Sequence, residues 1–164
     1  MKRINRFKTV GGITSNRPEV GTCRLVLYVE DDRDNREVAC ARLDEKYKIL
    51  LAKNDREACQ AFYKEGANLA LVLMDIELKG SRLNGIDLTR LIRGKLDSPN
   101  IPSYAKAVPQ LRVPVLFVTA YGRNYNRAEL LKAGGDDVIQ KPVDFIELHS
   151  AMTRAYLSRV GQRR

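Results

Sequence analysis

The sequence is poor in the residues that bind transition metals or cross-link a chain. Its 164 residues include three cysteines and one histidine. Cys23, Cys40 and Cys59 cannot all pair with one another, and none of them belongs to a CxxC motif or a Cys/His cluster. This pattern argues against a zinc site, and it favours a reducing, cytoplasmic location.

Long hydrophobic runs are also absent. The longest stretch without a charged residue is residues 113–122, whereas a membrane-spanning helix needs about 20 apolar residues. The basic N-terminus has no apolar segment after it, so a secretory signal is not predicted. The composition, with 44% hydrophobic and 30% charged residues, is typical of a globular protein, and the length suits one domain.

The net charge of +9 comes entirely from the two ends of the chain. Residues 1–24 hold six basic groups and one acid, and residues 150–164 hold four basic groups and no acid. Residues 25–149 hold 19 of each sign and are neutral. The basic ends are either solvated tails or segments that attract nucleic acid, anionic lipid or an acidic partner.

The pattern of apolar residues divides the chain into an extension and one domain. Residues 1–22 lack an apolar period and are predicted to be a disordered extension; residues 23–160 form the domain, and 161–164 a basic tail. Apolar runs predict strands at 25–29, 47–51, 69–75, 113–119 and 136–140. Helical patterns alternate with these strands, which predicts a doubly wound parallel α/β sheet with five helices. One connection, residues 94–112, is unusually long.

The sequence also predicts where some of the helices begin and end. Asn54, with Glu57 three residues later, and Asp144, with Glu147 three residues later, are predicted to cap the helices that follow them. The helix between the fourth and fifth strands is predicted from about residue 124 to residue 132 and should stop at Gly134-Gly135.

Polar residues stand where four of the predicted strands end. Glu30 and Asp31 follow the first strand, Asp75 ends the third, Thr119 ends the fourth, and Lys141 follows the fifth. These ends meet at one edge of a parallel sheet, where ligands bind. Clustered carboxylates repel one another unless a cation is present, and oxygen ligands suit Mg²⁺. The acids could instead cap the following helices, but their combination with a hydroxyl and an ammonium favours a phosphoryl site in which a carboxylate is the nucleophile.

At these residues the chain resembles the receiver domains of bacterial two-component response regulators. The resemblance covers about residues 24–158 and is carried by Val29-Glu30-Asp31-Asp32, Leu73-Met74-Asp75, Val118-Thr119-Ala120, Gly134-Gly135-Asp136-Asp137 and Lys141-Pro142. The spacings of 44 residues from Asp31 to Asp75 and 22 from Thr119 to Lys141 also fit. The resemblance implies a flavodoxin-like fold with strand order 2-1-3-4-5.

The resemblance also implies a role for each site residue. Asp75 would be the phosphoacceptor. The Mg²⁺ ligands would be Asp31, Asp75, the main-chain carbonyl of Glu77 and, through water, Glu30. Asp32 would belong to the turn or to the next helix cap.

The phosphoryl group would be bound by Thr119 and Lys141, and Lys141-Pro142 would carry a cis peptide bond. Tyr121 stands near the site in this fold and either packs there or modulates the access of water to the phosphoryl group.

The chain departs from the family pattern at three places. Val138 occupies the position three before Lys141, where the family usually has an aromatic switch residue. The loop after Asp75 is about two residues longer than usual and lacks the usual proline. The 94–112 connection is about a dozen residues longer than usual; we expect it at the edge opposite the site, either as a docking surface or as a plain loop.

These observations lead to one expected function and one alternative. The chain ends shortly after its last helix, so we expect a stand-alone receiver, which takes a phosphoryl group from a histidine kinase or phosphotransfer protein and contacts a downstream protein. We expect no enzymatic activity beyond its own phosphorylation and dephosphorylation, and a packing role for His149. The alternative is an adaptor with the receiver fold, whose basic ends bind an acidic partner or nucleic acid while phosphorylation is incidental.

Deleting residues 1–22 should remove much of any affinity for polyanions, because residues 25–149 are neutral. Retention on immobilised heparin measures this affinity, and it should weaken steeply with added salt as bound counterions are released. Equal retention of the full and truncated chains would contradict the assignment of this affinity to the N-terminal end.

Overall fold

The computed structural model describes residues 24–43, 45–120 and 125–161. Five strands alternate with five helices in these residues, as predicted. In chain order the elements are β1 (Arg24–Val29), α1 (Arg33–Leu43), β2 (Tyr47–Ala52), α2 (Asp55–Glu65), β3 (Leu69–Met74), α3 (Gly85–Ile92), the 3-10 turns η1 (Ser98–Asn100) and η2 (Ser103–Ala105), β4 (Val115–Ala120), α4 (Arg127–Ala133), β5 (Asp137–Lys141) and α5 (Phe145–Gly161).

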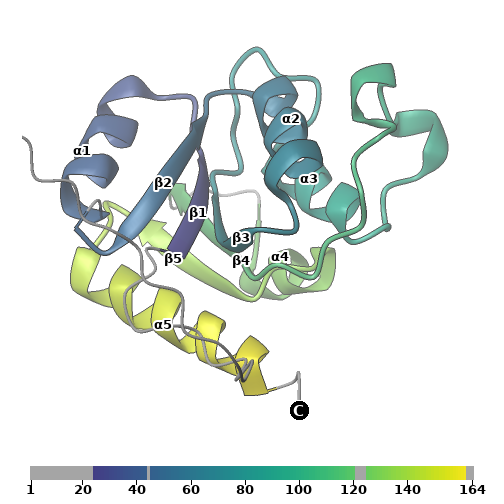
Figure 1. Ribbon diagram of the computed structural model, residues 1–164. Helices are drawn as coiled ribbons and strands as arrows, with labels where there is room; N and C mark the ends of the chain where they lie inside the picture. The colour runs from purple at the N-terminus through teal and green to yellow at the C-terminus, as the bar shows by residue number, and fades with distance from the viewer. Residues whose placement is uncertain (1–23, 44, 121–124, 162–164) are drawn as a thin grey trace, which may run out of the picture.

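The strands form one parallel sheet in the order β2-β1-β3-β4-β5 (Figure 1). This is the flavodoxin-like order that the sequence resemblance implies. The chain passes from β1 outward to β2 and then returns to β3 on the other side of β1. The carboxyl ends of β1 and β3 therefore flank the point where the direction of winding reverses, which is where open α/β sheets bind ligands.

Two hydrophobic clusters hold the helices against the sheet. Val26 and Tyr28 of β1 pack with α1 and α5, whereas Leu27 and Val29 pack in the cluster that contains α2, α3 and α4. Successive strand residues point to opposite faces, so β1 is buried on both sides. This burial explains why the strand reads as a continuous apolar run.

Side-chain caps set the start of the helices near the site edge. Asn54 accepts the amide of Glu57 at 2.9 Å, as the sequence predicts. The predicted cap of α5 is also confirmed, because Asp144 accepts the amide of Glu147. The prediction that α4 begins near residue 124 is wrong: the helix starts at Arg127, where Asn126 supplies the cap. Gly134 ends α4 as predicted, with a φ of 116°.

The long connection between α3 and β4 is anchored at its base by Arg93. The guanidinium of Arg93 donates to the carbonyls of Leu111 and Val113, both at 2.8 Å, and to that of Gly134 at 3.0 Å. It also bonds the carboxylate of Asp136 at 3.2 Å. One half-buried side chain thus ties the end of the connection to the end of α3 and to the start of β5.

The middle of the connection lies beside α2 and α3 (Figure 1). Its apolar side chains pack on the cluster that contains these helices: Leu96, Ile101, Tyr104, Ala105, Val108 and Leu111. The Tyr104 ring lies over the guanidinium of Arg56, in the first turn of α2, at 4.2 Å. The expectation that the whole connection stays at the edge opposite the site is therefore wrong, because burial of these side chains draws its middle toward the start of α2.

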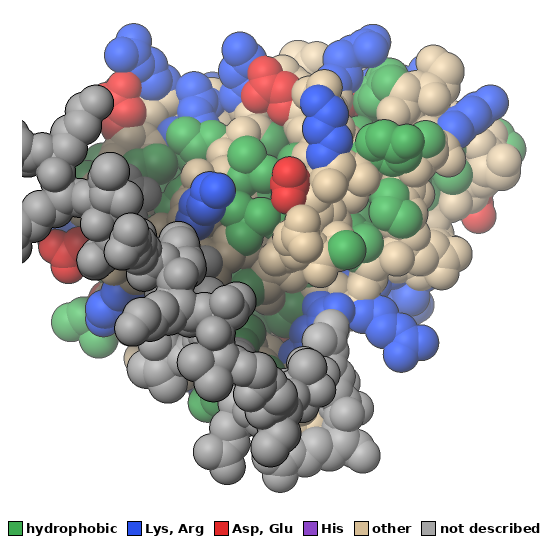
Figure 2. Space-filling view, viewed as in Figure 1, with side chains coloured by type: hydrophobic (Ala, Val, Ile, Leu, Met, Phe, Trp, Pro, Cys, Tyr) green, Lys and Arg blue, Asp and Glu red, His purple; other side chains and the backbone are tan. Residues whose placement is uncertain are grey.

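Some sequence predictions fall outside the described residues. They include the N-terminal extension, residues 1–22, and most of the tail, residues 161–164. Within the described part of the chain, no helix combines the length and the apolar character needed to cross a bilayer. On the face seen in Figure 2, hydrophobic side chains are exposed between scattered Lys and Arg side chains.

Replacing Arg93 with methionine should lower the free energy of unfolding by about 3 kcal/mol, because three backbone carbonyls lose a charged donor. Urea unfolding measures the change. Arg33→Met is the matched control: Arg33 is exposed and pairs with Glu37 within one helix, so its loss should cost less than about 0.5 kcal/mol. Equal effects of the two substitutions would contradict the anchoring role.

Candidate functional site

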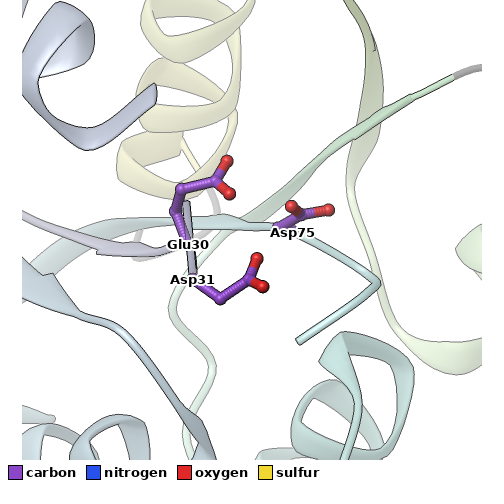
Figure 3. A group of neighbouring side chains, drawn as sticks. All are labelled: Glu30, Asp31 and Asp75. Atoms are coloured by element: carbon purple, nitrogen blue, oxygen red, sulfur yellow. The ribbon is translucent and has the colours of Figure 1, made fainter. Parts of the chain in front are cut away.

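The predicted acidic cluster forms beyond the carboxyl ends of β1 and β3. Glu30 and Asp31 follow β1, and Asp75 follows β3 (Figure 3). The amide of Asp75 donates to the carbonyl of Val29 at 2.9 Å, which continues the strand ladder by one residue and sets the two acidic segments side by side. One carboxylate oxygen from each of the three residues lies within 4.8 Å of the other two.

Lys141, at the end of β5, joins two of these carboxylates. Its Nζ lies 2.6 Å from Oε2 of Glu30 and 2.7 Å from Oδ2 of Asp75. Glu30 is fully buried and Asp75 is 6% exposed, so both charges depend on this partner. The Lys141-Pro142 peptide bond is cis, as the resemblance implies.

One ammonium does not balance three carboxylates. Burial raises the pKa of Asp75 to about 6, and the negative charge of Glu30 adds to the rise against the opposing effect of Lys141. Burial also acts to raise the pKa of Glu30, but the hydrogen bond and charge of Lys141 outweigh it and hold that pKa below its usual value. The cluster therefore keeps an excess of negative charge, and ionisation of Asp75 is unfavourable.

Two side chains that the sequence analysis missed hold the acidic segment in place. The hydroxyl of Tyr28 donates to Oε2 of Glu30 at 2.9 Å. Nη1 of Arg36 donates to the carbonyls of Glu30 at 2.8 Å and Asp31 at 2.7 Å. The strand period could have identified Tyr28, because residues two apart on a strand share a face. Asp32 caps α1 by accepting the amide of Asn35, as expected.

The loop between Asp75 and α3 touches the cluster through its backbone. The amide of Lys79 donates to Oδ2 of Asp31 at 3.2 Å. The loop is closed where Gly85 donates to the carbonyl of Ile76 at 2.9 Å. A Cβ at Gly85 would lie 2.0 Å from the carbonyl oxygen of Asp75, so this close approach requires glycine. Glu77 is exposed in the loop, and the role of its carbonyl as a metal ligand stays a prediction.

Two further residues that the sequence analysis singled out lie at the end of β4 and on β5. Thr119 is half-buried at the end of β4, and its hydroxyl donates to the carbonyl of Ala120 at 3.2 Å. Val138, in place of the family's usual aromatic residue, is half-buried against the core. Tyr121 lies outside the described residues, so its effect on water access stays a prediction.

The donor set fits Mg²⁺. It consists of carboxylate oxygens, carries excess negative charge and comes from two adjacent strand ends. Both oxygens of Glu30 already accept protein hydrogen bonds, from Tyr28 and Lys141 on one and from the amide of Asp32 on the other. Asp31 and Asp75 would therefore bind the ion directly, and Glu30 would act through a water molecule.

Comparison with known proteins places the site in a family. Residues 26–153 match the family described as "Response regulator receiver domain". An uncharacterized transcriptional regulatory protein of Bacillus subtilis, YrkP, is 34% identical over 126 residues, which cover 76% of this chain and 46% of the relative. The phosphate regulon transcriptional regulatory protein PhoB of Pseudomonas aeruginosa is 30% identical, with coverage of 84% and 53%. The chain spans about half or less of the length of the curated relatives first matched.

Solved structures show the same fold. The receiver domain of a Francisella response regulator has a TM-score of 0.67 and 22% identity, and the match covers 83% of this chain and 98% of the other. The receiver domain of NtrX from Brucella abortus has a TM-score of 0.63 and 26% identity, with coverage of 80% and 97%.

Asp75→Asn should stabilise the fold in buffer that contains a chelator. A raised pKa in the folded state means that stability is lost as pH rises through about 6, when Asp75 ionises. At pH 7.5 the variant should therefore gain at least about 1 kcal/mol, and the gain should shrink at pH 5. Urea unfolding at both pH values measures it, with the exposed Glu77→Gln as the control. A loss of stability at pH 7.5 would contradict this account of the cluster.

Proposed function

The chain belongs to the response regulator receiver domain family, and from this premise we propose that Asp75 accepts a phosphoryl group from the phosphohistidine of a kinase or phosphotransfer protein. The observation that carries the proposal is the position of Lys141 between Glu30 and Asp75. This lysine fixes the orientation of the acceptor carboxylate and supplies a cation where the phosphoryl oxygens arrive.

The proposed reaction transfers the group from nitrogen to oxygen. A carboxylate oxygen of Asp75 attacks the phosphorus, the bond between phosphorus and the imidazole nitrogen breaks, and an acyl phosphate forms while the imidazole keeps the bonding electron pair. Lys141 can then also donate to a phosphoryl oxygen, because its hydrogen bonds to Glu30 and Asp75 use two of its three N–H groups. Bound Mg²⁺ would neutralise the remaining phosphoryl charge.

Within this proposal the chain acts catalytically only on its own phosphorylation and dephosphorylation. Thr119 would turn its hydroxyl from the carbonyl of Ala120 toward the phosphoryl group. Tyr28 and Arg36 are positioning residues, because they hold the segment that carries Glu30 and Asp31.

The proposed target of the signal is a downstream protein that the phosphorylated chain contacts. The relatives are named transcriptional regulators, and they are longer than this chain's match. The expectation that this receiver acts alone in the cytoplasm stays a prediction. The alternative adaptor function also stays a prediction, since the basic N-terminal end lies outside the described residues.

Radiolabelled acetyl phosphate with Mg²⁺ should label the wild-type chain and fail to label Asp75→Asn. Asp31→Ala should also lose the label, because the cation would lose a direct ligand. The control is Asp97→Asn, an exposed acid in the long connection, which should be labelled like the wild type. Full labelling of Asp75→Asn would refute the proposed acceptor.

A further inference from the structure

A third buried carboxylate, Asp55, lies outside the acidic cluster and joins three segments of the chain. It is the first residue of α2 and is 3% exposed. Its Oδ2 accepts the amides of Arg82 at 3.1 Å and Leu83 at 3.0 Å, in the loop that follows Asp75. The same oxygen accepts the hydroxyl of Tyr104, from the long connection.

Tyr104 lies in a part of the long connection that packs on the hydrophobic core. Tyr104 belongs to η2, whose next residue, Ala105, is 1% exposed. The guanidinium of Arg56 covers the Tyr104 ring at 4.2 Å. The Tyr104 side chain is therefore held by Arg56 against its ring and by the hydrogen bond from its hydroxyl to Asp55, so the position of η2 is coupled to that of Asp55.

Asp55 is held as a carboxylate by these partners. Burial acts to raise its pKa, but the hydrogen bonds from Tyr104 and from the amides of Leu83 and Arg82 outweigh burial and lower it. The backbone amide of Asp55 also donates to Oγ of Ser81 at 3.1 Å. Asp55 thus contacts the loop through Ser81, Arg82 and Leu83, three successive residues.

The same loop reaches the acidic cluster at Lys79, two residues before Ser81. The amide of Ser81 donates to the carbonyl of Leu78, which closes a tight turn around Lys79. The amide of Lys79 in this turn donates to Oδ2 of Asp31. A short, hydrogen-bonded path therefore runs from Tyr104 through Asp55 and the turn to Asp31.

We propose that the hydrogen-bonded pair of Tyr104 and Asp55 positions residues 78–83 and, through them, the cation-binding carboxylate Asp31. The inference rests on the proposed function, and it gives the long connection a role: it braces the loop beside the phosphoacceptor. Tyr104 is a positioning residue, since it touches neither the acceptor nor the cation ligands.

The brace should affect cation binding rather than the transfer step. The hydrogen bond between Lys141 and Asp75 does not involve the loop. The rate of labelling of the variant at saturating Mg²⁺ should therefore stay within twofold of the wild-type rate. Substitution of a residue that hydrogen-bonds a metal ligand typically changes metal affinity by about 10–100-fold. Tyr104 is two contacts further from the cation than such a residue. We therefore expect a smaller rise, of about threefold, in the Mg²⁺ concentration that gives half-maximal labelling.

Tyr104→Phe tests the brace, because it removes the hydroxyl and keeps the ring that packs on Arg56. The full chain is labelled with acetyl phosphate over a series of Mg²⁺ concentrations, and hydrogen exchange of the Arg82 and Leu83 amides is followed in parallel. The variant should need about three times more Mg²⁺ and exchange these amides faster. Tyr63→Phe, on an exposed residue of α2, the helix that carries Asp55 and Arg56, is the control and should match the wild type.

The outcomes separate this inference from the proposed function. If the wild type is not labelled, the proposed function fails. The brace can then still be tested, because the Mg²⁺-induced rise in unfolding temperature compares the cation affinity of the wild type with that of Tyr104→Phe. A variant with wild-type half-saturation and wild-type amide exchange would overturn the brace. So would a variant whose saturating rate falls while its half-saturation is unchanged. Asp55→Asn, which keeps the shape and loses the charge, should shift half-saturation in the same direction as Tyr104→Phe.

Discussion

The contact on which the rest of the site depends is the bridge from Lys141 to Glu30 and Asp75. Glu30 and Asp75 are almost completely buried, and burying two carboxylates in this way is very costly unless a cation lies against them. The lysine comes from the last strand and the acids from the ends of the first and third. The bridge can form only when β5, β3 and β1 belong to one sheet and end at one edge, so the chemistry of the site requires the complete topology.

The same site works against the stability of the fold. Three carboxylates are clustered beside one ammonium, which bonds only Glu30 and Asp75, and ionised Asp75 is unfavourable in the folded chain. Groups arranged for binding commonly reduce stability in this way, and other parts of the structure offset the loss. Here the offset comes from the two apolar clusters and from anchors such as Arg93, which satisfies three carbonyls with one side chain.

The strand ends and helix caps could be predicted from the sequence because each depends on local chemistry. An apolar run followed by an acid indicates a buried parallel strand, and Asn54 three residues before Glu57 indicates a cap. Tyr28 was missed because a tyrosine within an apolar strand looks like a core residue. The path of the long connection was also missed: its apolar residues are sparse and lack a period, and α2, against which its middle packs, is distant in sequence.

The contacts of Arg93 determine where this fold can accept inserted residues. Its side chain ties the residue after α3 to the residues just before β4, so the connection begins and ends at nearly the same place. Chain added between these two points forms a closed excursion and does not move β4 or β5. The entropy of closing such a loop rises only slowly with its length. The exposed turn Ser98–Asn100 is therefore a natural insertion point for a reporter peptide or a small folded module, with the sheet left undisturbed.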